Sequence, residues 1–441
     1  MDISAIIITH NQREALELEI ESILMSGIVD KNHIFVADNF SDDDTHVWLE
    51  EQKDISFIIF DDEIHGYAQV LNTIIREFEI STDLLIISPT YFVLPTTLRK
   101  MQTVLQSGAG AVSCNICRTD GDVSYEQAVA IDKENTTSFD PVLRIDLQYD
   151  LVLISREMIL TMGAFNEKLF LPHNVILDFL FDGLEKGFRY FLDKKTYCYQ
   201  IGQNDDYFNY LLENDFEEMQ RRWGMKYFND SPNPLIIKRI IEDDNASFPV
   251  LEVGCDCGAN LLGVKEKYPN VELFGVEINE AAAKIASYFA NVKTGNIEDK
   301  NIDFGETRFK YILFGDVLEH LRDPQGTLEF CKSILMPDGY IIANIPNLMN
   351  YRVMKEIIDG RSTYEDHGLL DRTHIHFFTY FEKIDMFNRA GYTVEEINYN
   401  GDLSDETKES KRIVDTLLSL SSNTERFMYD AYQYIVKASV K

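Results

Sequence analysis

The stretch PVLEVGCDCGAN, residues 249–260, has the residue types of a nucleotide-binding loop. Gly254 and Gly258 bracket a turn after an apolar run, and Glu277 closes the next apolar run, 277 − 258 = 19 residues beyond the second glycine. In nucleotide-binding α/β folds, an acidic residue about 20 residues beyond the glycine loop binds the ribose hydroxyls. The spacing predicts a site for an adenosine-containing ligand. In the alternative, the glycines serve only a tight turn between strand and helix.

Asp256 distinguishes between the ligands that use such a loop. It stands where a middle glycine is usual. A dinucleotide places its pyrophosphate against this loop and the following helix N-terminus, where a carboxylate would repel it. S-adenosylmethionine instead carries a sulfonium and an ammonium, which tolerate an acid, and Asp enters the left-handed backbone region more readily than most residues. Asp256 therefore favours the cationic methyl donor.

The stretch GDVLEHL contains a first group of residues suited to acid–base chemistry. Methyl transfer needs an acceptor atom in line with the methyl group and usually a base that takes the acceptor's proton. Asp316, Glu319 and His320 have i, i+3, i+4 spacing, so we expect a helix that presents them on one face. In the alternative, Glu319 and His320 only cap and anchor that helix.

The stretch LLDRTHIHFF adds Asp371, His374 and His376. We expect His374 to act as the base, ahead of a second hypothesis in which Glu319, His320 and His374 hold a divalent cation such as Mg²⁺. Magnesium prefers oxygen ligands, so two imidazoles suit it only loosely. The structural alternative is that one of the later histidines is a satisfied core residue.

The elements that position these residues belong to an acidic chain of 441 residues, long enough for two or three domains. Its 41 basic and 74 acidic residues give a net charge of −33, which disfavours nucleic acid and anionic membrane surfaces as partners. No apolar run reaches the roughly 20 residues of a membrane span, and the first residues lack signal-peptide features. The six cysteines are scattered, which indicates a cytoplasmic protein. Cys114 and Cys117 read as core residues of a buried strand.

Strands and helices alternate twice along the chain, which predicts two α/β domains with parallel sheets. The turn-rich stretch NDSPNPL, residues 229–235, is the expected linker. We place one domain at 1–232 and a second at 233–400, with a helix at 236–244. Residues 401–441 are charged and show no further strand pattern, so we expect a C-terminal helical extension.

The second domain resembles class I S-adenosylmethionine-dependent methyltransferases, in the group of the ubiquinone-biosynthesis O-methyltransferases. The matching segments are VLEVGCDCGANL, GVEINEAAA, TGNIED, FGDVLEHLRDP, LMPDGYIIANIPN and LLDRTHIHFFT. The resemblance implies a Rossmann-like fold in which Glu277 binds the ribose, Asn296 and Ile297 flank the adenine, and Asp316 lies beside the methionine part. The full cofactor set that it implies is Glu252, Gly254, Asp256, Gly258, Glu277, Ile278, Asn296, Ile297 and Asp316. The implied catalytic residues are His374, Asp316 and His320.

This sequence departs from that family at Asp256 and at Asn296, where the family more often has Asp. Asn296 retains a side-chain oxygen for the adenine amino group, so we expect weakened binding and not its loss.

The first domain resembles family 2 glycosyltransferases of the GT-A fold over residues 3–228. SAIIITHNQREALELEIESIL, IFVADNFSDDDT, HGYAQVLNTII, GAFNEKLFL and RRWGMKYF match in order. The resemblance implies that a nucleotide sugar would be surrounded by Thr9, Asn11, Asp38, Asn39 and Asn72.

The metal motif of those enzymes is missing. A sugar diphosphate normally needs a divalent cation held by an Asp-containing turn, but Ser88, Pro89 and Thr90 occupy that turn. His173 and Asp178 stand near the place of the usual acidic base, but out of register. We therefore expect a degenerate domain that serves as a binding platform.

These patterns together predict a methyltransferase that O-methylates a sugar or glycan, so we expect a small-molecule or glycan acceptor as its partner. Two alternatives stay open. One is a bifunctional glycosyltransferase and methyltransferase that also binds a nucleotide sugar. The other is a non-catalytic scaffold that binds glycans or nucleotides.

Overall fold

The computed structural model describes residues 2–118, 124–134, 136–145, 147–201, 212–224, 228–401 and 407–441. The chain divides into a first unit, Met1–Asp230, and a second unit, Ser231–Lys441. Each unit has its own sheet, so the predicted α/β class is confirmed. Among the described residues, no helix is both long enough and apolar enough to cross a membrane.

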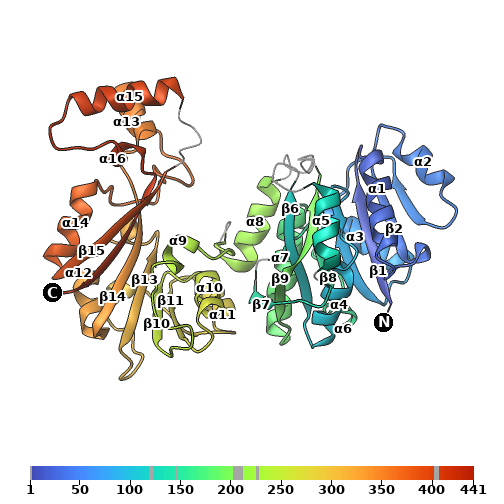
Figure 1. The fold of residues 1–441 in the computed structure, drawn as a ribbon, viewed down its shortest axis with the longest axis horizontal. Coiled ribbons are helices and arrows are strands. Elements are labelled where there is room, and N and C mark those ends of the chain that lie inside the picture. The colour runs from blue at the N-terminus through green and yellow to red at the C-terminus, as the bar shows by residue number, and fades with distance from the viewer. Residues whose placement is uncertain are drawn as a thin grey trace. The chain divides into compact units, whose positions relative to one another are not determined.

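The sheet of the first unit has strand order β3-β2-β1-β4-β8-β6-β9-β5, and β7 pairs with β9 (Figure 1). The strands β3, β2, β1 and β4 run parallel, whereas β8 is antiparallel to both β4 and β6. The bounds of these strands are β1 Ile3–Thr9, β2 Ile34–Asn39, β3 Ser56–Phe60, β4 Asp83–Ile87, β5 Tyr91–Val93, β6 Ala111–Arg118, β7 Pro141–Arg144, β8 Leu151–Ile154 and β9 Tyr190–Gln200.

Helices cover this sheet, and β1, β2, β4 and β8 are buried along their whole length. Such continuous burial is the reason that these strands appear in the sequence as unbroken apolar runs. The helices are α1 Arg13–Met25, α2 Thr45–Glu51, α3 Tyr67–Glu77, α4 Thr97–Gln106, α5 Tyr125–Glu134, α6 Arg156–Met162, α7 Pro172–Glu185 and α8 Leu212–Trp223.

The sheet of the second unit has strand order β12-β11-β10-β13-β14-β16-β15 (Figure 1). The strands β12, β11, β10, β13 and β14 are parallel, so their carboxyl ends meet at one edge. The bounds are β10 Pro249–Val253, β11 Glu272–Glu277, β12 Asn291–Thr294, β13 Phe309–Gly315, β14 Leu335–Pro346, β15 Tyr392–Asn400 and β16 Gln433–Val440. The helices are α9 Pro234–Ile237, α10 Ala259–Lys267, α11 Glu280–Ala286, α12 Pro324–Ile334, α13 Tyr351–Ile358, α14 Tyr380–Arg389, α15 Lys408–Ser419 and α16 Phe427–Asp430.

The expectation of a purely helical extension at residues 401–441 is wrong. Helix α15 lies there, but β16 inserts antiparallel between β14 and β15 and completes the sheet. Lys437 interrupts the apolar strand pattern in the sequence because a lysine at that position suggests a solvent-exposed segment. In the fold, its ammonium donates to the Arg239 carbonyl at 3.1 Å and lies 4.4 Å from the centre of the Tyr340 ring.

The helix expected at residues 236–244 is also wrong beyond its first turn, because α9 ends at Ile237. Two tyrosine hydroxyls contact backbone carbonyls that would otherwise pair with amides within a helix. Tyr268 Oη donates to the Ile240 carbonyl at 2.7 Å, and Tyr311 Oη contacts the Ile241 carbonyl at 3.3 Å. These tertiary hydrogen bonds outweigh the local helical pattern.

Glu19 on α1 is a buried acid in the first unit. Among the described residues, neither of its carboxylate oxygens has a hydrogen-bond partner, and burial raises its pKa well above the ordinary value. Burial therefore favours the protonated carboxyl in the folded chain, whereas in the unfolded chain the group ionises at its ordinary pKa. Folding stability must fall as pH rises from about 4.3, the ordinary pKa of Glu, toward the raised value.

We predict that Glu19→Gln removes this pH dependence. Relative to the wild type, the variant should gain stability as pH rises from 5 to 7, by at most about 1.4 kcal/mol per pH unit, which is the limiting slope for one proton. Both tryptophans, Trp48 and Trp223, belong to the first unit, so tryptophan fluorescence during urea unfolding reports on it. Glu21→Gln, an exposed change on the same helix, is the control. Parallel pH profiles for Glu19→Gln and the wild type would contradict the prediction.

Candidate active site

The glycine loop of the second unit joins β10 to α10 at the carboxyl edge of the sheet. Gly254, Asp256 and Gly258 all have positive φ, at 68°, 48° and 90°. A side chain at Gly254 would place its Cβ 2.6 Å from the Val317 side chain, so only glycine fits there. The expectation that Asp256 takes a left-handed conformation is confirmed.

Glu277 connects this loop to the end of β11. Its carboxylate accepts hydrogen bonds from the Asp256 amide at 2.9 Å and from the Asn279 amide at 2.8 Å. These two bonds fix the orientation of the carboxylate before any ligand arrives. The side chain lines a cavity and is 7% exposed.

The cavity has a volume of about 250 Å³ and lies across the ends of four parallel strands. It is lined by Val253, Gly254, Val276, Glu277, Ile278, Gly295, Asn296, Ile297, Glu298, Asp316, Val317, His320 and Leu321. Seven residues that the sequence analysis assigned to the cofactor or to catalysis are among them: Gly254, Glu277, Ile278, Asn296, Ile297, Asp316 and His320. The Ile278 side chain is 71% exposed on this rim, where it offers an apolar surface to a flat ring.

Glu252 is not one of the lining residues, although we expected it in the cofactor site. It lies behind the loop, where it accepts a hydrogen bond from Asn260 Nδ2 at 2.7 Å. Burial, with the nearby charges of Asp256 and Glu277, raises the pKa of Glu252 to about 8. The side chain is therefore neutral at physiological pH, and its hydrogen bond with Asn260 helps to hold the loop in place.

Asn296 lines the cavity and also has a structural role. Its side-chain oxygen, which we expected to accept from the adenine amino group, accepts a hydrogen bond from the Glu298 amide at 2.9 Å. It thereby caps the short 3₁₀ helix Ile297–Asp299. The carbonyl oxygen has only one lone pair left for a ligand.

Asp316 follows β13 and has a left-handed backbone, with φ of 55°. The helix expected over residues 316–320 is wrong because this conformation ends the strand and leaves only the 3₁₀ turn Leu318–His320. Burial raises the pKa of Asp316 to about 6. Its carboxylate is thus charged above that pH and faces the cavity near His320.

Two amides that the sequence analysis missed hold Asp316. Asn344 Nδ2 donates to its oxygens at 3.1 and 2.9 Å, and Gln433 Nε2 donates to Oδ1 at 2.6 Å. Gln433 lies 117 residues further along the chain, at the start of β16. Local sequence contains no signal for it because its position depends on the insertion of that strand.

A second group lies beside Asp316, where Glu319, His320 and His374 offer ligand atoms that all lie within 4.8 Å of one another. Glu319 is fully buried, and neither of its carboxylate oxygens has a hydrogen-bond partner among the described residues. His374 Nε2 lies 4.0 Å from Glu319 Oε1, and the His320 and His374 rings meet edge to face with centres 4.8 Å apart.

The two histidines differ in their partners. His320 Nδ1 lies 3.2 Å from both the carbonyl and the hydroxyl of Thr373, which fixes its ring. His374 Nδ1 is buried and has no hydrogen-bond partner among the described residues. Burial and the charge of His320 lower the pKa of His374, so this imidazole is neutral at pH 7. His376 points elsewhere, with Nε2 at 3.3 Å from the Arg322 carbonyl.

The three residues fit a divalent ion with small movements. Metal bonds of about 2.0–2.2 Å place neighbouring ligand atoms roughly 3–3.5 Å apart, so the 4.0 Å separation of Glu319 and His374 has to shorten by up to about 1 Å, and separations that reach 4.8 Å by up to about 1.8 Å. Two imidazoles and one carboxylate suit Zn²⁺ or Mn²⁺ better than Mg²⁺, which prefers oxygen. The unpartnered Glu319 oxygens are the atoms that such an ion would satisfy.

In the first unit, Thr9 and Asp38 are register partners at the carboxyl ends of β1 and β2. Both are buried, and Thr9 Oγ1 and Asp38 Oδ2 have no hydrogen-bond partner among the described residues. The other residues that we expected around the nucleotide already form hydrogen bonds within the first unit. Asn11 Oδ1 accepts from the Asp42 amide at 2.8 Å, Asn39 exchanges hydrogen bonds with the His65 backbone, and Asn72 does so with the Phe165 backbone.

The turn without a metal motif nevertheless has a carboxylate beside it, which sequence reasoning missed. Asp150 accepts from Ser88 Oγ at 2.8 Å and from Tyr91 Oη at 3.2 Å. Asp178 binds Arg222 at 2.5 Å and Trp223 Nε1 at 2.8 Å, and His173 lies 3.4 Å from Asp230. Each of these acids is already engaged within the first unit.

Comparison with known proteins places a methyltransferase in this chain. Residues 217–397 match the family described as "Methyltransferase domain". The ubiquinone biosynthesis O-methyltransferase of Acinetobacter baylyi is 24% identical over 145 residues, which cover 30% of this chain and 60% of that protein. The enzyme of the same name from Haemophilus ducreyi is 25% identical over 148 residues, covering 30% and 62%. The chain thus spans about 60% of the length of these curated relatives.

A solved structure, an S-adenosylmethionine-dependent methyltransferase from Archaeoglobus fulgidus, is 18% identical and covers 53% of this chain and 99% of its own, with a TM-score of 0.32. That score supports no functional conclusion. The prediction of an S-adenosylmethionine-dependent methyltransferase domain is confirmed by the family match and the relatives.

We predict that Gln433→Leu weakens S-adenosylmethionine binding by about 3–10-fold at pH 7, because Asp316 loses a donor that favours its charged form. The carboxylate loses its charge as pH falls through about 6, so wild-type affinity should fall there. In the variant, the same fall should occur at higher pH. Calorimetric titration between pH 5.5 and 8 measures both effects, with Ser439→Val on the same strand as the control. An unchanged pH midpoint would contradict this role of Gln433.

Proposed function

We propose that this chain transfers the methyl group of S-adenosylmethionine to a hydroxyl oxygen, with the methyltransferase domain that residues 217–397 match. The observation that carries the proposal is the group of buried Glu319 with the partly buried His320 and His374, which lies next to the cavity at the ends of the parallel strands. His320 lines the cavity and belongs to the group, so it links the donor site to the acid–base residues.

The donor is held by groups whose charges match its own. The Glu277 carboxylate binds the ribose hydroxyls, while Ile278 and Ile297 contact the adenine ring from the cavity wall. The Asp316 carboxylate attracts the ammonium and sulfonium of the methionine part. These assignments rest on the lining of the cavity and on the orientation of Glu277 and Asp316 by backbone and amide donors.

His374 takes the proton of the acceptor hydroxyl as the methyl group is transferred. Its pKa is lowered, so the ring is neutral and able to accept a proton at physiological pH. Burial raises the pKa of Glu319 well above its ordinary value, and a positive charge on His374, 4.0 Å away, favours the ionised carboxylate, so the two charges stabilise each other once the proton is on His374. A divalent ion at the same three residues would instead polarise the hydroxyl and lower its pKa. The unpartnered oxygens of Glu319 favour this second candidate.

The acceptor that we propose is a sugar or glycan hydroxyl. The first unit supports this choice through its resemblance to GT-A glycosyltransferases and through the two unpartnered oxygens of Thr9 and Asp38 at adjacent strand ends. Asp150 is already engaged by Ser88 and Tyr91, which supports a platform that binds a nucleotide sugar without transferring it. The curated relatives are named for ubiquinone biosynthesis, so a phenolic acceptor is the competing class.

Methyl-labelled S-adenosylmethionine, incubated with the protein and an extract of its own cells, tests the proposal. We expect the label in the water-soluble carbohydrate fraction. Glu277→Ala should reduce labelling at low donor concentration by about 10–100-fold, since the loss of a hydrogen bond to a charged group costs roughly 1.5–3 kcal/mol. Glu272→Ala, an exposed change on the same strand, should label normally. Label in a solvent-extracted phenol or quinone would overturn the acceptor class, and the absence of label would overturn methyl transfer.

We predict that His374→Ala lowers the methyl-transfer rate by about 10²–10⁴-fold. The wild-type rate should rise with pH through the lowered pKa of His374, below about 6.5, and the variant should lose this rise. His376→Ala, which changes a histidine outside the group, is the control. If His374→Ala keeps the wild-type pH profile, His374 is not the base.

We predict that Zn²⁺ or Mn²⁺ raises the melting temperature of the wild type and that Mg²⁺ has little effect, because the ligand set contains two imidazoles. An ion at 100 times its dissociation constant adds about 2.7 kcal/mol of stability. Glu319→Gln should abolish the effect, whereas Glu329→Gln, an exposed change on α12, should keep it. If no ion changes the melting temperature, these three residues do not hold a metal, and His374 acts as the base without one.

A further inference from the structure

The first unit contains a second cavity that none of the roles discussed so far uses. Its volume is about 450 Å³, within the usual range of small-molecule sites. It lies between α5 and the strands β6 and β9. Neither the nucleotide residues Thr9 and Asp38 nor the turn at Ser88 takes part in its lining.

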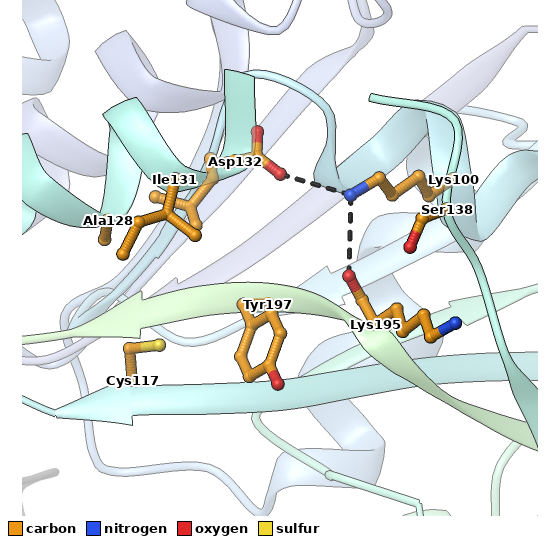
Figure 2. A pocket seen from close by; sticks show the side chains of 9 residues that line it. Lys100, Cys117, Ala128, Ile131, Asp132, Ser138, Lys195 and Tyr197 are labelled. Atoms are coloured by element: carbon orange, nitrogen blue, oxygen red, sulfur yellow. Dashed lines mark hydrogen bonds and ion pairs between the residues drawn. The ribbon is translucent and has the colours of Figure 1, made fainter. Parts of the chain in front are cut away.

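The walls of this cavity are mainly apolar. Figure 2 shows Ala128 and Ile131 on α5, with Cys117 on β6 and Tyr197 on β9 across from them. Ile131 and Tyr197 are large side chains that remain 51% and 39% exposed. An aliphatic and an aromatic side chain that both stay exposed at one cavity provide contact surface for an apolar ligand group.

Lys100 places a positive charge in this wall although its side chain is only 3% exposed. Its ammonium lies 3.4 Å from Asp132 Oδ1 and 3.5 Å from the Lys195 carbonyl (Figure 2). Charge-assisted hydrogen bonds of an ammonium are normally about 2.7–2.9 Å long, so both contacts are weak. Among the described residues, these are the acceptors within hydrogen-bond reach of an ammonium that has three protons to donate.

Asp132 does not neutralise this charge well because its carboxylate already accepts hydrogen bonds from Thr96, at the start of α4. Its carboxylate accepts from the Thr96 amide at 2.7 Å and from Thr96 Oγ1 at 2.5 Å. Lys195, a second cation, also lines the cavity. In a chain with a net charge of −33, this cavity is a local site of positive charge. A buried ammonium without close acceptors is costly unless a ligand supplies one.

We propose that this cavity binds a small amphipathic molecule with a single anionic head group. The head group binds the Lys100 ammonium, and the apolar part lies between Ile131 and Tyr197. A carboxylate, a sulfonate or a phosphate monoester offers the required oxygens. A diphosphate is disfavoured because, among the lining residues that the structure describes, Lys100 is the one buried cation.

Two fluorescent probes with the same rings separate the charge requirement from the apolar one. They are 1-anilinonaphthalene-8-sulfonate, which is an anion, and N-phenyl-1-naphthylamine, which lacks the sulfonate. The titrations use the full chain with saturating S-adenosylhomocysteine, so that the cavity of the second unit is blocked. We expect one saturable site for the sulfonate and at least about 10-fold weaker binding of the neutral amine.

Variants then assign that site to this cavity. Lys100→Met keeps the side-chain volume and should weaken the sulfonate at least about 10-fold while leaving the amine unchanged. Ile131→Glu puts a like charge at an exposed wall position and should weaken the sulfonate more than its neutral match Ile131→Gln does. The exposed Lys186→Met is the control and should bind as the wild type does.

If Lys100→Met folds poorly, Ile131→Glu and Ile131→Gln still test the site. Ile131 is half exposed, so changes there leave the core intact. Circular dichroism checks the fold of each variant. Wild-type sulfonate binding in both Lys100→Met and Ile131→Glu would overturn the site. Equal affinity for the two probes would overturn the anionic head group.

Discussion

The hydrogen bond from the Asp256 amide to the Glu277 carboxylate is the interaction on which the donor site depends. It joins the end of β10 to the end of β11, and it requires the left-handed conformation of Asp256. Because the Asn279 amide holds the other carboxylate oxygen, Glu277 faces the cavity in a fixed orientation. The chain thus arranges negative groups around this loop. That field suits a sulfonium donor and opposes a pyrophosphate.

Each of the two candidate sites contains buried polar atoms that have no hydrogen-bond partner among the described residues. In the second unit these atoms belong to Glu319 and His374, and in the first unit to Thr9 and Asp38. Folded chains pair nearly all such atoms because an unpaired one costs free energy. Glu319 lies in the turn just after β13, and Thr9 and Asp38 lie at the carboxyl ends of β1 and β2, where α/β folds bind ligands, so a ligand site explains the cost of leaving their atoms unpaired.

The sequence was sufficient for the parts of the fold that local pattern determines. Buried parallel strands appear in the sequence as apolar runs, and Gly254, Glu277 and His320, which the sequence analysis assigned to the site, line the cavity. It failed where distant residues decide. The hydroxyls of Tyr268 and Tyr311 end a helix that periodicity favoured. Asn344 reaches Asp316 because β14 pairs with β13, and Gln433 reaches it because β16 pairs with β14. Asp150 reaches Ser88 from the turn before β8.

The place of β16 also affects how the second unit is made. It follows β15 along the chain but lies between β14 and β15, and within the described residues β16 is the strand that pairs with β15. During synthesis, β15 therefore leaves the ribosome before the strand that will hold it, and the edge of β14 stays open meanwhile. Nascent chains that stall between residues 400 and 433 carry two unpaired strand edges. Such chains are prone to aggregate and are natural clients for chaperones that shield exposed strands.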